Sequence, residues 1–266
     1  MSDWKIVFSS IPKWRCGLLP DNSFLRNAPR VIDLQSRLQW EVLVNASDAM
    51  WLSYKRLKAK LRKVGDSAEL LVSERTRSAV SVDCWSIVDN AHAYLQIVRS
   101  LNLKKEGNHE ALLKNFGATI SKIRNGMDHI HQQISNMAHK KGGKYPLFGT
   151  VGFCTKLRQS GEFEWCSFPL GGMQFNEQFL CPFDSLVVPS RDCVSQICFS
   201  AFDETLNISK LVIEMRLAIR SMSKDVKRHL YPLIVETAKE HKSDFTKIMS
   251  ETVKGAIIVK MKLVRA

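Results

Sequence analysis

The stretch from Ile123 to His131, with the letters IRNGMDHIH, holds the residue types best suited to chemistry on a phosphodiester. Arg124 is followed directly by Asn125, and His129 comes five residues after the arginine. Cleavage of RNA through its own 2'-hydroxyl needs a group that transfers protons near neutral pH and a cation that stabilises the phosphorane. We expect His129 to act as general base or acid, Arg124 to clamp the phosphate, and Asn125 to position it. We expect no cofactor and no metal ion in this site.

The spacing of this motif raises a geometric problem, because residues five apart on an ideal helix are rotated by about 140° from one another. Gly126 lies inside the motif, and glycine lowers helix propensity. A loosened turn at Gly126, or the long side chain of Arg124, would bring both groups to one phosphate. The alternative is an ordinary helix surface, with a solvated Arg124 and with His129 capping an apolar stripe.

Long amphipathic helices are expected to position the motif, because apolar residues recur at three- and four-residue steps through much of the first half of the chain. The expected helices cover residues 31–65, 66 or 67 to about 101, 109–116 and 118–139. Asp33 favours the start of the first helix, and Ser67 is a possible N-cap of the second. His92 lies on the apolar side of the second helix, where we expect it in the core. Short connections favour an antiparallel bundle.

The order of Arg124, Asn125 and His129 resembles the signature of the HEPN family (higher eukaryotes and prokaryotes nucleotide-binding domain). In that family the motif lies on, or at the start of, the last long helix of a small helical bundle, and the resemblance covers about residues 31–140. The segment DCWSIVDNAHAYLQIVRSL also looks like HEPN-type helices in which an acidic residue, here Asp83 or Asp89, faces the motif. The alternative for both aspartates is a helix-surface or salt-bridge role.

The resemblance implies a metal-independent endoribonuclease, in which two motifs meet across a homodimer to form one basic cleft. It also implies a role in prokaryotic defence, or as a toxin that a neutralising protein partner controls. The alternative in this family is a non-catalytic HEPN-like domain that serves as a nucleotide- or RNA-binding interaction module. A third interpretation is a helical scaffold whose charge binds protein or membrane surfaces.

The second half of the chain changes character after KKGGKYP, residues 140–146, which predicts a boundary. The expected parts are an irregular arm at 1–30, the HEPN-like bundle at 31–140 and a β-containing region with basic helices at 145–266. A hairpin is predicted first, then strands at 186–188 and 193–202, a helix capped by Asn207 or Ser209 with a kink or restart near Pro232, and a final strand in the tail. The fold class is therefore α+β: a mainly helical antiparallel bundle, a small antiparallel β region and a long basic helix.

A formal charge of +13 and a pI near 9.5 make nucleic acid the first partner to consider. Cations recur at three- and four-residue steps along the predicted helix after Asn207, which suits a phosphate backbone, although a solvated face is the alternative. These candidate RNA-binding residues are Arg216, Arg220, Lys224, Lys227 and Arg228.

The remaining composition excludes several other classes of protein. No window offers about 18 unbroken apolar residues, so we expect no membrane span and a cytoplasmic protein. The seven cysteines form no Cys-x-x-Cys pair, which favours reduced thiols over disulfides or zinc. His129, His131 and His139 do not share one helix face, and no carboxylate or cysteine pattern completes a metal site with them.

Overall fold

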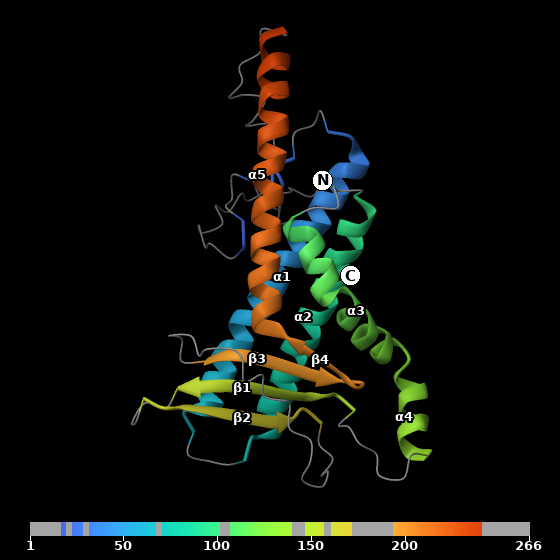
Figure 1. The fold of residues 1–266 in the computed structure, drawn as a ribbon, viewed down its shortest axis with the longest axis vertical. Coiled ribbons are helices and arrows are strands. Elements are labelled where there is room, and N and C mark those ends of the chain that lie inside the picture. Colours follow the sequence, from blue (N-terminus) through green and yellow to red (C-terminus); the bar gives the residue numbers. More distant parts are fainter. Residues whose placement is uncertain are drawn as a thin grey trace, which may run out of the picture.

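The computed structural model describes residues 17–19, 23–28, 32–67, 71–101, 107–139, 147–156, 161–171 and 194–240. These residues form a mixed α+β protein with five helices and a four-stranded antiparallel sheet (Figure 1). The helices are α1 (Leu34–Gly65), α2 (Glu74–Ser100), α3 (Asn108–Asp128), α4 (Ile130–His139) and α5 (Ile208–Glu240). The strands are β1 (Thr150–Lys156), β2 (Phe163–Pro169), β3 (Val194–Ala201) and β4 (Glu204–Asn207).

Helices α1 and α2 pack against each other and begin at capping residues. The Asp33 carboxylate accepts the Ser36 backbone N–H at 2.8 Å, as expected for an acidic N-cap. The predicted start of α2 at Ser67 is wrong, because α2 begins at Glu74 and Ser73 is its cap. Ser67 instead donates its backbone N–H to the Val64 carbonyl at 3.2 Å, which closes the end of α1.

The predicted pair of helices at 109–116 and 118–139 is also wrong, because α3 is continuous through Gly117 and the break comes at His129. Gly117 is buried, and a Cβ there would lie 3.1 Å from the Arg99 guanidinium of α2. This glycine therefore serves a close contact between helices. The motif consequently lies at the end of α3, where sequence reasoning expected the interior of a longer helix.

The sheet has the order β2-β1-β3-β4, with every neighbouring pair antiparallel. The predicted hairpin appears as β1 and β2, and the predicted strand at 193–202 appears as β3. Strand β4 was not predicted. It follows a tight turn in which Phe202 and Asp203 have φ values of 50° and 66°. The predicted strands at 186–188 and in the tail lie outside the described residues.

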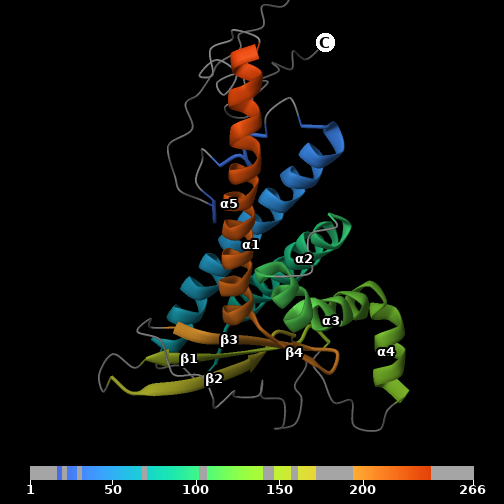
Figure 2. The same ribbon diagram turned by 45° about the horizontal axis from the view of Figure 1, so that its top comes forward.

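Helix α5 starts where sequence reasoning placed it and completes the helical packing. The Asn207 carboxamide oxygen accepts the Lys210 backbone N–H at 2.9 Å, which is an N-cap, and the helix continues through Pro232. α5 packs against both α1 and α3, and it rises from the sheet beside α1 (Figure 2). Its buried side chains are Ile208, Leu211, Val212, Met215, Ala218, Ile219 and Met222.

One hydrophobic core joins the two halves of the chain. It includes Leu57 of α1, Val88 of α2, Ile120 of α3, Phe199 of β3 and Met215 of α5. α5 therefore packs with α1 and α3 around the same core, in which residues 118–128 of α3 also take part through Ile120 and Ile123. The expected boundary at 140–146 lies outside the described residues, so the division into 1–30, 31–140 and 145–266 stays a prediction.

Candidate functional site

The predicted motif lies where α3 ends and α4 begins. Arg124 lies just before the last turn of α3 and Asn125 begins that turn, while His129 caps the C-terminus of the helix with φ −107° and ψ 32°. The His129 backbone N–H donates to the Asn125 carbonyl at 3.0 Å, and the His129 carbonyl accepts the Gln132 N–H at 2.9 Å. His129 thus joins two helices. Its side chain and that of Asn125 are exposed.

Arg124 is held by two carboxylates. Its Nε lies 2.8 Å from an Asp89 oxygen on α2, and its Nη1 donates to Asp128 one turn further along α3. The Arg124 side chain is 30% exposed, while Asp89 and Asp128 are 53% and 50% exposed. The acidic residue that faces the motif is therefore Asp89, and both ion pairs are open to solvent.

His92 joins this group, although sequence reasoning placed it in the core. It lies one turn after Asp89 on α2, is half-buried, and its Nε2 is 3.0 Å from the Gln96 side-chain nitrogen. Burial lowers the pKa of His92 below 6.5, and the charges of Arg124 and Arg99 lower it further, whereas Asp128 and Asp89 raise it. A neutral His92 with its proton on Nδ1 accepts the Gln96 amide N–H. The four residues Asp89, His92, Arg124 and Asp128 are called the Arg124 cluster below.

The position of the Arg124 cluster depends on a close contact at Gly126. A Cβ at Gly126 would lie 2.3 Å from a ring carbon of Phe202, in the turn between β3 and β4. Phe202 also packs near Trp85 of α2, with ring centroids 6.0 Å apart. The expected loosening of the helix at Gly126 is therefore wrong. The glycine instead lets the end of α3 pack closely against Phe202 in the β3–β4 turn. Because α3 stays helical to Asp128, Arg124 and His129 keep different directions.

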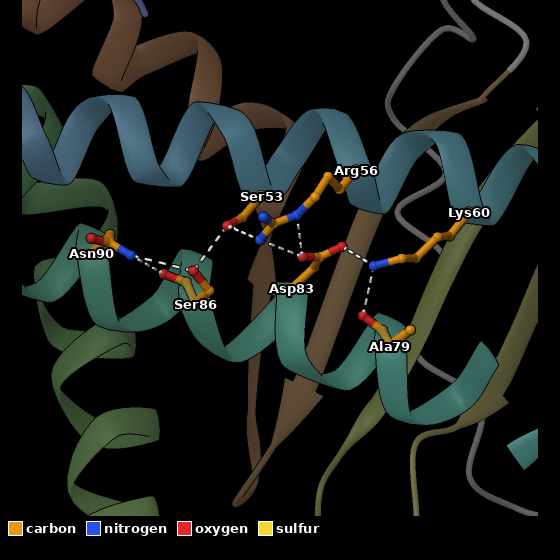
Figure 3. A network of polar contacts seen from close by, with 7 residues as sticks. All are labelled: Ser53, Arg56, Lys60, Ala79, Asp83, Ser86 and Asn90. Atoms are coloured by element: carbon orange, nitrogen blue, oxygen red, sulfur yellow. Dashed lines mark hydrogen bonds and ion pairs between the residues drawn. The ribbon is translucent and has the colours of Figure 1, made fainter. Parts of the chain in front are cut away.

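The other predicted supporting residue, Asp83, does not face the motif. It is 1% exposed and lies between α1 and α2, with Arg56 Nη2 2.9 Å and Lys60 Nζ 2.5 Å from its two oxygens (Figure 3). A salt-bridge role was the alternative expected for Asp83, and the structure shows that role, although the burial of the carboxylate and its two cation partners were not predicted. The signal for this network was an aspartate among the apolar positions of α2, level with cations in α1.

The five predicted RNA-binding cations of α5 are all exposed. They share one face of the helix, opposite the side that enters the core. Only Arg228 has a described ion pair among them, with Asp225 at 3.4 Å. The same face carries exposed apolar or aromatic side chains at Ile213, Leu217 and Tyr231. The face is therefore cationic with apolar surface between the charges, and we call it the α5 face.

Within the described residues, no three His, Cys, Asp or Glu side chains are grouped closely enough to hold a metal ion. In the same part of the chain, no helix is long and apolar enough to cross a membrane. Comparison with family models, with curated proteins and with solved structures finds no match to this chain.

Proposed function

We propose that this protein binds RNA through the α5 face. The observation that carries the proposal is the row of five exposed cations, of which only Arg228 shares its charge with a described acid. From Arg216 to Arg228 the helix rises by about 18 Å, so the charges extend over several nucleotides. Cations spaced in this way displace the counterions of a phosphate backbone, which is the main source of affinity for nucleic acids.

The apolar part of the α5 face favours single-stranded RNA over a duplex. Tyr231 is 47% exposed, and Ile213 and Leu217 are 60% and 52% exposed. Aromatic side chains stack on unpaired bases, and apolar side chains lie against their faces, whereas a duplex hides those faces. The choice of RNA over DNA rests on the resemblance of the Arg124 motif to HEPN ribonucleases.

The test measures affinity for a fluorescein-labelled single-stranded RNA by anisotropy at several salt concentrations. Replacing Arg216, Arg220 and Lys224 together with glutamine should weaken binding and flatten the dependence of log Kd on log salt by about 0.7 for each phosphate that the variant no longer neutralises. Lys114→Gln with Lys122→Gln is the control on α3: both lysines are exposed, Lys122 pairs with Glu204 at 2.6 Å, and the control removes two charges where the α5 variant removes three. Equal affinity of the α5 triple variant and the wild type would reject this function.

A second candidate function is metal-independent cleavage of RNA at the Arg124 cluster. The observation that favours it is that His92 lies one turn from Asp89, which pairs with Arg124, while His129 follows Asp128 directly. One imidazole would take the proton of the 2'-hydroxyl as that oxygen attacks phosphorus, and the other would protonate the departing 5'-oxygen. The products are a 2',3'-cyclic phosphate and a 5'-hydroxyl. Arg124 would stabilise the phosphorane after exchanging a carboxylate for the phosphate.

Cleavage also rests on features that the resemblance implies. Arg124 and His129 of one copy point in different directions, so a homodimer that brings two Arg124 motifs together across one cleft would supply the two groups from different copies. Asn125 would position the phosphate. A role in defence or as a toxin, with a neutralising protein partner, belongs to the same proposal. Sedimentation of the purified protein measures whether two copies associate.

The cleavage test uses a mixed RNA substrate in EDTA, with 2',3'-cyclic ends as the diagnostic product. Arg124→Ala and His129→Ala should each abolish cleavage, and His92→Gln should slow it. His131→Ala is the matched control, because His131 is also an exposed histidine just past the end of α3. Cleavage that survives both Arg124→Ala and His129→Ala would leave RNA binding as the function.

A further inference from the structure

Asp83 organises two cations at the seam between α1 and α2. Arg56 donates from Nε and Nη2 to one Asp83 oxygen, at 3.0 and 2.9 Å, and Lys60 Nζ donates to the other at 2.5 Å (Figure 3). Arg56 also donates to the Ser53 hydroxyl at 3.1 Å, and Lys60 to the Ala79 carbonyl at 3.0 Å. Both long side chains are therefore fixed in direction, although they begin on a helix surface.

The seam keeps a surplus of positive charge. Asp83 is 1% exposed and contributes one negative charge, whereas Arg56 and Lys60 are 49% and 30% exposed and contribute two positive charges. One cation would neutralise the carboxylate, so the second leaves a net charge of +1 that faces solvent. A carboxylate buried between two partly exposed cations thus makes the site attractive to anions.

Two further cations extend this charge along the seam. Arg56 contacts Asp83 while Lys60 contacts Ala79, so α1 and α2 run in opposite directions. Lys63 is one turn beyond Lys60 on α1, and Arg75 is one turn before Ala79 on α2, which places them level with each other. Both side chains are exposed. Arg56, Lys60, Lys63 and Arg75 are called the seam cations below.

We infer that the seam cations form a second phosphate-binding site, which holds the backbone of the RNA that the α5 face binds. The inference rests on the proposed RNA binding and names a different surface for it. An arginine and a lysine held in place by Asp83 lose little side-chain freedom when a phosphate arrives, which lowers the cost of binding. The planar guanidinium of Arg56 suits phosphate oxygens, and Lys60 adds a point charge beside it.

The ordinary alternative is that Asp83 only joins two helices. A structural ion pair needs one cation, and it gains nothing from exposed Lys63 and Arg75 one turn away. Those two residues therefore separate the two interpretations: they make no described contact with Asp83, and their removal leaves the buried pair intact. A purely structural Asp83 predicts that Lys63 and Arg75 do not affect RNA binding.

The experiment compares three double or triple variants with wild type in the RNA anisotropy assay across a salt series. Lys63→Gln with Arg75→Gln should weaken binding and flatten the salt dependence by about 0.7 for each phosphate that these side chains neutralise in the wild type. Lys114→Gln with Lys122→Gln is the matched control, and the α5 triple variant is run beside it. Thermal unfolding of the seam variant should match that of the wild type, because both replaced side chains are exposed.

Arg56→Gln provides a second variant within the fixed pair, with its folding checked by circular dichroism. Weaker RNA binding by both seam variants, at unchanged affinity in the control, supports the site. Wild-type affinity and salt dependence in Lys63→Gln with Arg75→Gln, together with weak binding by the α5 variant, overturns the seam and leaves the proposed function standing. Absence of RNA binding by the wild type overturns both.

Discussion

The Arg124 cluster and the Asp83 network are built from the same groups in opposite proportions. In the first, one arginine is shared by Asp89 and Asp128, and all three side chains are at least 30% exposed. In the second, one aspartate is shared by Arg56 and Lys60, and the aspartate is buried. The first site pairs its cation with its own acids, and the second keeps a cation in surplus.

This difference predicts that different surfaces bind RNA and act on its phosphates. An anion approaching the Arg124 cluster meets two carboxylates, and even Arg99 nearby only balances the charges. An anion approaching the seam or the α5 face meets uncompensated cations. We therefore expect RNA affinity to come from the seam and the α5 face, while the Arg124 cluster acts on a phosphate only after another surface has delivered it.

Burial separates the sites as well, because exposed ion pairs contribute little to stability and buried ones are costly to break.

The largest expected effect comes from breaking the buried network. Arg56→Met with Lys60→Met leaves the Asp83 carboxylate buried without a partner, so the free energy of unfolding should fall by about 3–5 kcal/mol. Urea unfolding followed by circular dichroism measures it. Adding Asp83→Leu to the same variant removes the stranded charge and should restore most of the stability.

The matched change in the exposed cluster is Arg124→Met, which should alter the free energy of unfolding by less than about 1 kcal/mol. If Arg124→Met lowered the free energy of unfolding as much as Arg56→Met with Lys60→Met does, burial would not distinguish the two sites.

A smaller effect concerns the contact that positions the Arg124 cluster. Gly126→Ala drives a methyl group into the Phe202 ring, whereas Gly117→Ala meets only the flexible end of Arg99. Both changes gain the same helix propensity, so their difference in unfolding free energy isolates the clash, at roughly 1–3 kcal/mol. Thermal or urea unfolding of the two variants measures it. Equal stabilities would show that α3 does not depend on close contact with the β3–β4 turn.

Removing an acid from the Arg124 cluster should make it resemble the seam. Asp128→Asn frees Arg124 Nη1, so RNA affinity should rise by up to about fivefold, the equivalent of an exposed ion pair. Glu110→Gln is the control, because Glu110 is an exposed acid on the same helix without an arginine among its described contacts. An equal rise in both variants would reflect net charge alone and would contradict a specific inhibition of Arg124.

Long periodic helices and the strands bounded by turn residues were predictable, because their signals are local. α1 ends at Gly65 as expected, and Asn207 caps α5. The start of α2 was not predictable, since Ser67 and Ser73 are equally good caps until tertiary contacts choose between them. Gly117 and Gly126 were misread for a similar reason: glycine disfavours a helix by itself, but here it admits Arg99 and Phe202 at close range.

Arg124 and Asp89 of the candidate site were singled out from the sequence, but their pairing was not predictable, and neither His92 nor Asp128 was assigned to the site. Asp83 and Asp89 both lie on α2, and spacing alone does not decide which of them faces α3. His92 was assigned to the core because it falls on the apolar side of α2. It is instead half-buried and contacts the polar Gln96, which hydrophobic periodicity does not report. The seam was missed because a run of lysine and arginine resembles a solvated face until a buried carboxylate is found beside it.

The smallest expected effect tests the charges around His92. Burial lowers the pKa of His92, and the charges of Arg124 and Arg99 lower it further, whereas Asp128 and Asp89 raise it. Because the unfolded chain then binds a proton more readily than the folded one, His92 contributes full stability above about pH 6.5, and this is lost as the pH falls toward its folded pKa.

Arg124→Gln should raise the pKa of His92 toward 6.5, as histidine ring resonances in an NMR titration would report. His109, whose pKa is lowered by burial and which faces Asp225, should be unchanged in the same spectra. If the pKa of His92 is unchanged in Arg124→Gln, His92 does not interact with Arg124 and does not belong to the Arg124 cluster.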